Sequence, residues 1–115
     1  MKEGASMTVL ELQKALQLQA FSLPDPARQV TGGYCGDLLS WVMGRAQQGD
    51  GWVTIMSSRN VAAVASLTDV SCVILAEDVR PDADLAEVCT DKGINLLGGM
   101  DGTFALSVKL GELLK

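Results

Sequence analysis

The side chains best suited to bind an anion lie together in one short segment, Ser57-Ser58-Arg59-Asn60. Two hydroxyls and a guanidinium stand at the start of a predicted helix, where free N–H groups carry a partial positive charge. Such donors suit a phosphate or a carboxylate. The alternative is that Ser57, Ser58 and Asn60 only cap the helix while Arg59 lies in solvent. The sequence supports both interpretations.

A second candidate is the glycine-rich segment Thr31-Gly32-Gly33-Tyr34-Cys35-Gly36, which follows a predicted strand and precedes a helix. It matches neither a P-loop nor a dinucleotide-binding fingerprint. The alternative is a plain turn in which the glycines adopt positive φ. Gly98-Gly99, before another predicted helix, is likewise either a ligand-binding segment or a plain turn. Asp37 is either the cap of the next helix or a ligand to a metal or a ribose.

Catalysis would depend on carboxylates or a thiol, because the chain contains no histidine. Asp37, Asp78 or Asp101 would act as the base and Cys35 as the nucleophile. The aspartates precede predicted helices, where capping explains them without chemistry. A thiol near a helix N-terminus can be reactive, but no base neighbours Cys35 in the sequence. We therefore expect the protein not to be an enzyme and to need no metal or cofactor.

The composition of the 115 residues predicts one domain over residues 7–115, after a frayed segment 1–6. Apolar residues make up 48% and aromatic residues 4%, which suits helices packed on a buried parallel sheet. The net charge of −5 argues against nucleic-acid and membrane-surface partners. Three widely spaced cysteines and the lack of a long apolar run predict a cytoplasmic protein.

The elements that must position these residues alternate between strands and helices. Strands are predicted at 28–31, 52–56, 71–76 and 95–97, and helices at 8–18, 37–47, 60–68, 81–92 and 101–114. Thr8 with Glu11 forms a capping box, Asn60 and Asp101 are expected caps, and Gly93 ends a helix. The pattern predicts an α/β fold: a small, open, mostly parallel sheet of about four strands with helices on both faces.

Ligands of such sheets bind outside the carboxyl ends of the strands, near a topological switch point. The two candidate segments, one containing Thr31 and the other Arg59, are therefore expected to face each other there. The segment Glu77-Asp78-Val79-Arg80 also follows a predicted strand, but its carboxylates would repel an anion.

From about Leu10 onward the chain resembles a DRTGG domain. The similarity rests on Val30–Leu39, Gly51–Ile55, Asn60–Ala65, Gly93–Leu97 and the final helix. Gln29-Val30 replaces the acidic-basic pair of the name-giving motif, so only Thr31, Gly32 and Gly33 match it.

The resemblance implies an α/β module that is regulatory or mediates dimerisation and has no established catalytic activity. Such domains occur in phosphotransacetylases and CBS-containing pyrophosphatases and are related to the N-terminal domain of HPr kinase. Short stand-alone versions occur in anaerobic bacteria, near genes for iron-only hydrogenases and histidine-kinase-like proteins.

The function expected from the sequence is a non-catalytic regulatory module, a homodimer that binds an unidentified protein partner and is tuned by a small ligand. Trp41-Val42-Met43 offers apolar surface for a symmetric interface, and Trp41 and Trp52 are expected to be half-exposed. The alternative is a sensor of a nucleotide or other phosphate-bearing metabolite. Its ligand-binding residues would be Thr31, Gly32, Gly33, Asp37, Ser57, Ser58, Arg59, Asn60, Gly98 and Gly99.

Overall fold

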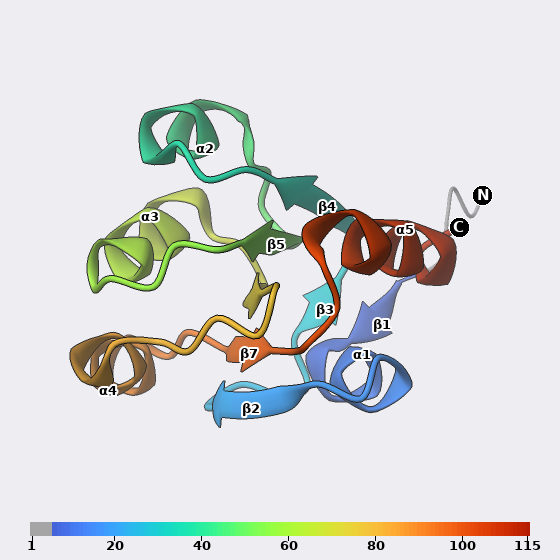
Figure 1. Ribbon diagram of the computed structural model, residues 1–115, viewed down its shortest axis with the longest axis horizontal. Coiled ribbons are helices and arrows are strands. Elements are labelled where there is room, and N and C mark those ends of the chain that lie inside the picture. The colour runs from blue at the N-terminus through green and yellow to red at the C-terminus, as the bar shows by residue number, and fades with distance from the viewer. Residues whose placement is uncertain (1–5) are drawn as a thin grey trace.

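A computed structural model describes residues 6–115, so the segment predicted to fray lies outside the described residues except for Ser6. A five-stranded sheet with the order β2-β7-β6-β5-β4 forms its centre (Figure 1). The strands are β2 (Gln19–Ser22), β4 (Gly32–Cys35), β5 (Asp50–Thr54), β6 (Cys72–Leu75) and β7 (Leu96–Gly98). Strands β4 to β7 are parallel, and β2 is antiparallel to β7. The predicted α/β fold with a mostly parallel sheet is confirmed.

Helices cover both faces of this sheet. They are α1 (Val9–Ala15), α2 (Leu39–Arg45), α3 (Asn60–Thr68), α4 (Ala83–Lys92) and α5 (Thr103–Leu113). Helices α2, α3 and α4 connect strands that are neighbours in both chain and sheet, and right-handed crossovers place all three on one face (Figure 1). Helices α1 and α5 lie on the other face, with α5 against β4 and β5. Among the described residues, no helix is long and apolar enough to cross a membrane.

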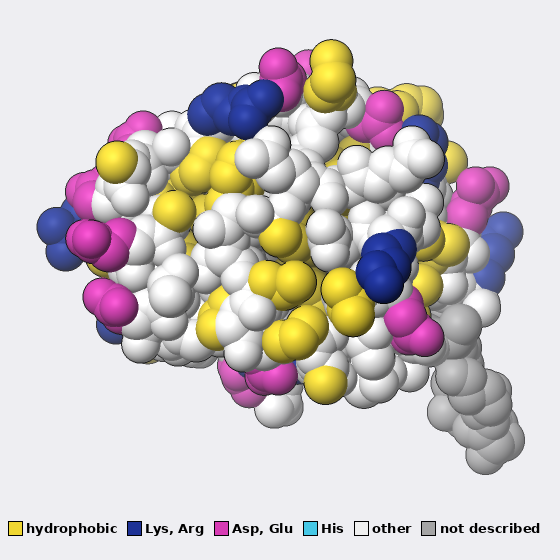
Figure 2. Space-filling model, turned by 90° about the horizontal axis from the view of Figure 1, so that it is seen from below, with side chains coloured by type: hydrophobic (Ala, Val, Ile, Leu, Met, Phe, Trp, Pro, Cys, Tyr) yellow, Lys and Arg dark blue, Asp and Glu magenta, His cyan; other side chains and the backbone are white. Residues whose placement is uncertain are grey.

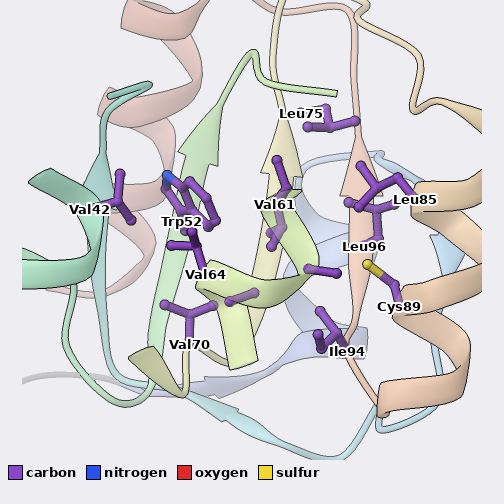
Figure 3. Close-up of a cluster of buried hydrophobic side chains, with 13 residues drawn as sticks. Val42, Trp52, Val61, Val64, Val70, Leu75, Leu85, Cys89, Ile94 and Leu96 are labelled. Carbon is purple, nitrogen blue, oxygen red and sulfur yellow. The ribbon is translucent and has the colours of Figure 1, made fainter. Parts of the chain in front are cut away.

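The core divides into two clusters, one on each face of the sheet. Trp52 and Leu75 point toward α2, α3 and α4, whereas Val53 and Ile74 point toward α1 and α5. Figure 3 shows the Trp52 ring beside Val42 and Val64. Its Nε1 donates to the Gly36 carbonyl over 2.9 Å, so the indole is fully buried with its polar atom satisfied. The expectation of a half-exposed Trp52 is wrong, whereas Trp41 is exposed and lies beneath the Arg45 guanidinium.

Three strands, namely β1 (Met7–Thr8), β2 and β4, were not predicted. Helix α1 ends at Ala15 rather than near residue 18, because Gln17 adopts φ 55° and turns the chain into β2. The strand predicted at 28–31 is shorter: β3 (Gln29–Val30) pairs with β1 (Met7–Thr8) in a separate two-stranded sheet. The glycine-rich segment after it is the edge strand β4, where the sequence predicted a loop.

The helix ends that depend on local signals are as predicted. Thr8 and Glu11 form the capping box of α1, and Gly93 ends α4 with φ 76°. Two expected caps are wrong. Asn60 is the first helical residue of α3 and no side chain caps that helix. Asp101 does not cap α5, because the side chain of Glu77 accepts from Thr103 N over 2.9 Å instead.

Candidate functional site

The predicted site residues lie at opposite ends of the sheet. Gly32 pairs with Asp50, the first residue of β5, so Thr31 and Gly32 stand at the amino ends of the strands. Ser57–Asn60 follows the carboxyl end of β5, and Gly98-Gly99 lies at the carboxyl end of β7. The expectation that the two candidate segments face each other is therefore wrong. Strands β4 to β7 also lie in chain order, so this parallel part contains no switch point.

The glycines of β4 serve close packing. A Cβ on Gly32 would lie 2.8 Å from Asp50 Oδ1, and a Cβ on Gly33 would lie 3.0 Å from Leu110 Cδ2 of α5. Among the described residues, the glycines with positive φ are Gly49 and Gly93. The interpretation of Gly32 and Gly33 as a turn with positive φ is thus also wrong. They allow the Asp50 carboxylate and α5 to approach an edge strand.

Thr31 packs on the turn before β5. Its N–H donates to the Gly49 carbonyl over 2.9 Å, and a Cβ on Gly49 would lie 2.5 Å from Thr31 Oγ1. The next residue, Asp50, is a buried carboxylate that the sequence did not single out, since Gly49-Asp50-Gly51 resembles an ordinary break before a strand. Burial raises its pKa, and the hydrogen bond from Gln47 N to Oδ2, 2.8 Å long, partly offsets this.

The raised pKa of Asp50 predicts a pH dependence of stability. The folded protein holds this proton more tightly than the unfolded chain does, so the buried carboxylate lowers the free energy of unfolding at neutral pH. The loss of stability caused by the ionised Asp50 disappears as the pH falls through the raised pKa, because the carboxyl group becomes protonated. As the pH rises from below the ordinary value of 3.8 to neutrality, Asp50→Asn is expected to gain stability relative to wild type. Urea unfolding of both proteins across this range measures the difference, and a constant difference would contradict the prediction.

Asp37 joins two strand ends. Its Oδ1 accepts from Thr54 Oγ1 over 2.8 Å and from Ile55 N over 2.9 Å. It does not cap α2, whose N-cap position is occupied by Leu38 without a side-chain hydrogen bond. Within residues 6–115, no group of three or more His, Cys, Asp or Glu side chains is arranged to hold a metal ion. The structure shows Asp37 in a positioning role that neither sequence interpretation included.

The Ser57–Asn60 segment forms an open helix start. The Ser57 carbonyl accepts from Asp82 N over 3.0 Å, and the Ser58 carbonyl accepts from Val61 N over 3.0 Å. Arg59 and Asn60 are exposed. Ala62 N likewise donates to the Arg59 carbonyl over 3.0 Å, so the N–H groups of Val61 and Ala62 are paired and the exposed donors here are side chains. The carboxylate of Asp82, 3.5 Å from Ser57 Oγ, limits the positive charge of this group.

Gly98 and Gly99 line a hollow of about 220 Å³ beside β2. Its polar side is made by Arg80, whose Nη1 donates to Gln19 Oε1 over 3.0 Å and whose Nη2 lies 3.5 Å from Asp78 Oδ1. Its apolar side includes Phe21. Because β2 was not predicted, the sequence could not bring Gln19 and Phe21 to this place.

The loop that carries Arg80 has an unusual backbone. Glu77 and Asp78 follow one another with φ of 63° and 58°, a conformation that non-glycine residues adopt rarely. Glu77 N donates to the Asp101 carbonyl over 2.8 Å, and Asp78 N donates to the Gly99 carbonyl over 2.9 Å. These bonds hold the loop after β6 against the loop after β7. Paired left-handed residues of this kind are enriched at functional sites.

The three cysteines differ in exposure, since Cys72 and Cys89 are buried and Cys35 is exposed. Burial raises the pKa of Cys72 to about 12 and that of Cys89 to about 11, so both thiols stay protonated. Cys35 is exposed on β4. It lines a second hollow, of about 210 Å³, between β4 and α5, together with Gly33, Val53, Ser107, Leu110 and Leu114.

Comparison with known proteins found structural similarity to the regulatory region of an enzyme. A scan against protein-family models and a search of curated proteins found no match. The chain is similar to a solved structure of the CBS and DRTGG domains of the regulatory region of Clostridium perfringens pyrophosphatase, complexed with its activator, diadenosine tetraphosphate. The TM-score is 0.74, the identity is 14%, and the match covers 94% of this chain and 47% of that one. The likeness shows the fold, and the fold fits a DRTGG-like domain, as the sequence suggested.

Proposed function

We propose that this protein is a non-catalytic regulatory module that works in the cytoplasm as a homodimer and contacts a further protein. The observation that carries the proposal is the exposed apolar side of α2. Leu38, at the N-cap position, is 61% exposed, and Trp41, three residues on and therefore on the same side, is 55% exposed. Val42, which the sequence placed on this surface, is buried, and Met43 lies on another side of the helix. Apolar side chains grouped in this way favour association. The likeness to a regulatory region of an enzyme supports the same conclusion.

The carboxylates that the sequence offered for catalysis support a non-catalytic role. Asp37 holds the ends of β4 and β5 together, and Asp78 lies 3.5 Å from Arg80 Nη2 in the loop after β6. Asp101 forms an ion pair of 2.8 Å with Lys109. Each of these groups is occupied in stabilising a loop or a helix end.

Sedimentation equilibrium of the purified protein at micromolar concentrations tests the homodimer. A mass twice that of the chain is the expected result. A single species with the mass of one chain would refute the homodimer and with it the role of the α2 surface.

A second candidate function is a sensor of a nucleotide or another phosphate-bearing metabolite, bound at the hollow beside Gly98 and Gly99. The arrangement of Arg80, held by Gln19 and Asp78 next to the Phe21 ring, favours this site. Residues Ser57, Ser58, Arg59 and Asn60 offer a separate group of donors. Thr31, Gly32 and Gly33 lie at the other end of the sheet, so they do not belong to the same site.

Thermal unfolding against nucleotides and phosphometabolites at millimolar concentration tests the sensor. A ligand present at 100 times its Kd stabilises the native state by about 2.7 kcal/mol. We expect Arg80→Gln to abolish the shift of an active compound and Arg59→Gln to leave it unchanged. The reverse pattern would move the site to the start of α3, and no shift with any compound would refute the sensor.

A further inference from the structure

The two edges of the sheet differ in how they are protected against pairing with another strand. The register of β2 is broken between Ala20 and Ser22, and Pro24 and Pro26 follow the strand. Irregular pairing and prolines are devices that keep an edge from extending the sheet. Figure 2 shows this side of the molecule, where hydrophobic side chains are interrupted by polar side chains and backbone.

The β4 edge lacks these devices. Its sequence, Gly32-Gly33-Tyr34-Cys35, contains no charge and no proline, and it pairs with β5 without a register shift. Gly33 and Cys35 are exposed, whereas every residue of β5 is buried. An uncharged, regular edge strand is a ready template for another strand. The hollow under α5, lined by Val53, Leu110 and Leu114, leaves further apolar surface uncovered beside it.

The charge distribution points to a second copy of this chain as the occupant of the edge. The protein carries a net charge of −5, so most pairs of its surfaces repel each other. Arg45 lies over the Trp41 ring, 3.9 Å from its centroid. From Thr31 to Gly44, by contrast, the sequence contains a single charged side chain, Asp37, which is bonded to Thr54 and Ile55. Two copies can meet at this segment with little repulsion between like charges.

We propose that two copies associate through this edge, with their β4 strands antiparallel across a two-fold axis and the Leu38 and Trp41 sides of α2 in contact. The inference rests on the proposed homodimer and specifies its interface. A two-fold axis brings the same surface of both copies together, and a strand edge is matched to itself in length and hydrogen-bonding pattern. The same contact covers the exposed apolar side chains that begin α2.

Native Cys35 gives a direct distance measurement, since the other two cysteines are buried. A spin label on Cys35 is expected to report a separation within about 20 Å, because each label lies at most three residues from the axis. A dimer formed through β2 would give about 40 Å, since nine strand spacings would separate the labels. That result would overturn the interface but leave the homodimer intact. A labelled protein that is monomeric while the unlabelled protein is dimeric would also place Cys35 in the contact.

A pair of variants tests the same interface without a label. Trp41→Glu places a charge on the proposed contact, and the matched control Leu67→Glu places one on α3, where Leu67 is 75% exposed. We expect Trp41→Glu to lose the dimer in sedimentation experiments and Leu67→Glu to keep it, with both proteins folded by circular dichroism. Retention of the dimer by Trp41→Glu would overturn the proposed interface. A monomeric wild type would refute the homodimer itself.

Discussion

Replacing Trp52 by alanine is expected to lower the free energy of unfolding by about 3–5 kcal/mol. The indole is fully buried between α2 and α3, beside Val42 and Val64 (Figure 3). Its removal leaves a cavity in the middle of one core cluster and leaves the Gly36 carbonyl without its donor. Urea unfolding followed by circular dichroism measures the loss.

The control for this prediction is Trp52→Phe, which keeps most of the ring and removes only the Nε1 donor. Leaving a buried carbonyl without its partner costs about 1–3 kcal/mol, so phenylalanine is expected to lose less stability than alanine. Trp41, which is exposed, remains as a fluorescent reporter in both variants. An alanine variant as stable as wild type would mean that Trp52 does not lie where the structure places it.

Replacing Gly49 by alanine is expected to destabilise the protein by about 2 kcal/mol or more. The left-handed backbone at Gly49, with φ 88°, costs a residue with a Cβ about 1–2 kcal/mol. The new methyl group would also lie 2.5 Å from Thr31 Oγ1. The same substitution at Gly111 is a matched control, because Gly111 is in α5 and no atom lies within 4 Å of its added Cβ.

The two alanine substitutions should change the free energy of unfolding in opposite directions. Gly111→Ala is expected to stabilise the helix by about 0.5–1 kcal/mol. Adding Thr31→Ala to Gly49→Ala should recover the steric part of the loss but not the part due to φ. Equal effects at Gly49 and Gly111 in urea unfolding would contradict the close contact between Thr31 and the turn before β5.

The elements predicted correctly are those with strong local signals. The continuous apolar run of β6 identifies a strand buried on both faces, and the Thr8 capping box and Gly93 mark helix ends. The edge strands β2 and β4 were missed because their own residues have weak strand signals. Gly32-Gly33 becomes a strand only because β5 pairs with it and α5 packs on it, and neither contact is visible locally.

The candidate site was predicted less well because it depends on strand order. The identity of the donors, such as Arg59, follows from sequence, but their grouping does not. Thr31 and Arg59 were expected to face each other but lie at opposite ends of the sheet. Asp37 and Glu77 bind partners 17 and 26 residues away, so local capping rules gave them the wrong roles or none.

Hydrogen–deuterium exchange at high and low protein concentration tests the central claim most directly, because it follows both sheet edges of the unmodified protein in one experiment. At the concentration where the dimer forms, the amides of β4 and of the start of α2 are expected to exchange more slowly, while those of β2 stay unchanged. If the amides of β2 exchange more slowly at high than at low protein concentration, while those of β4 are unaffected, the result would contradict the proposed interface. Exchange that is independent of concentration at both edges, in a protein of monomer mass, would contradict the homodimer.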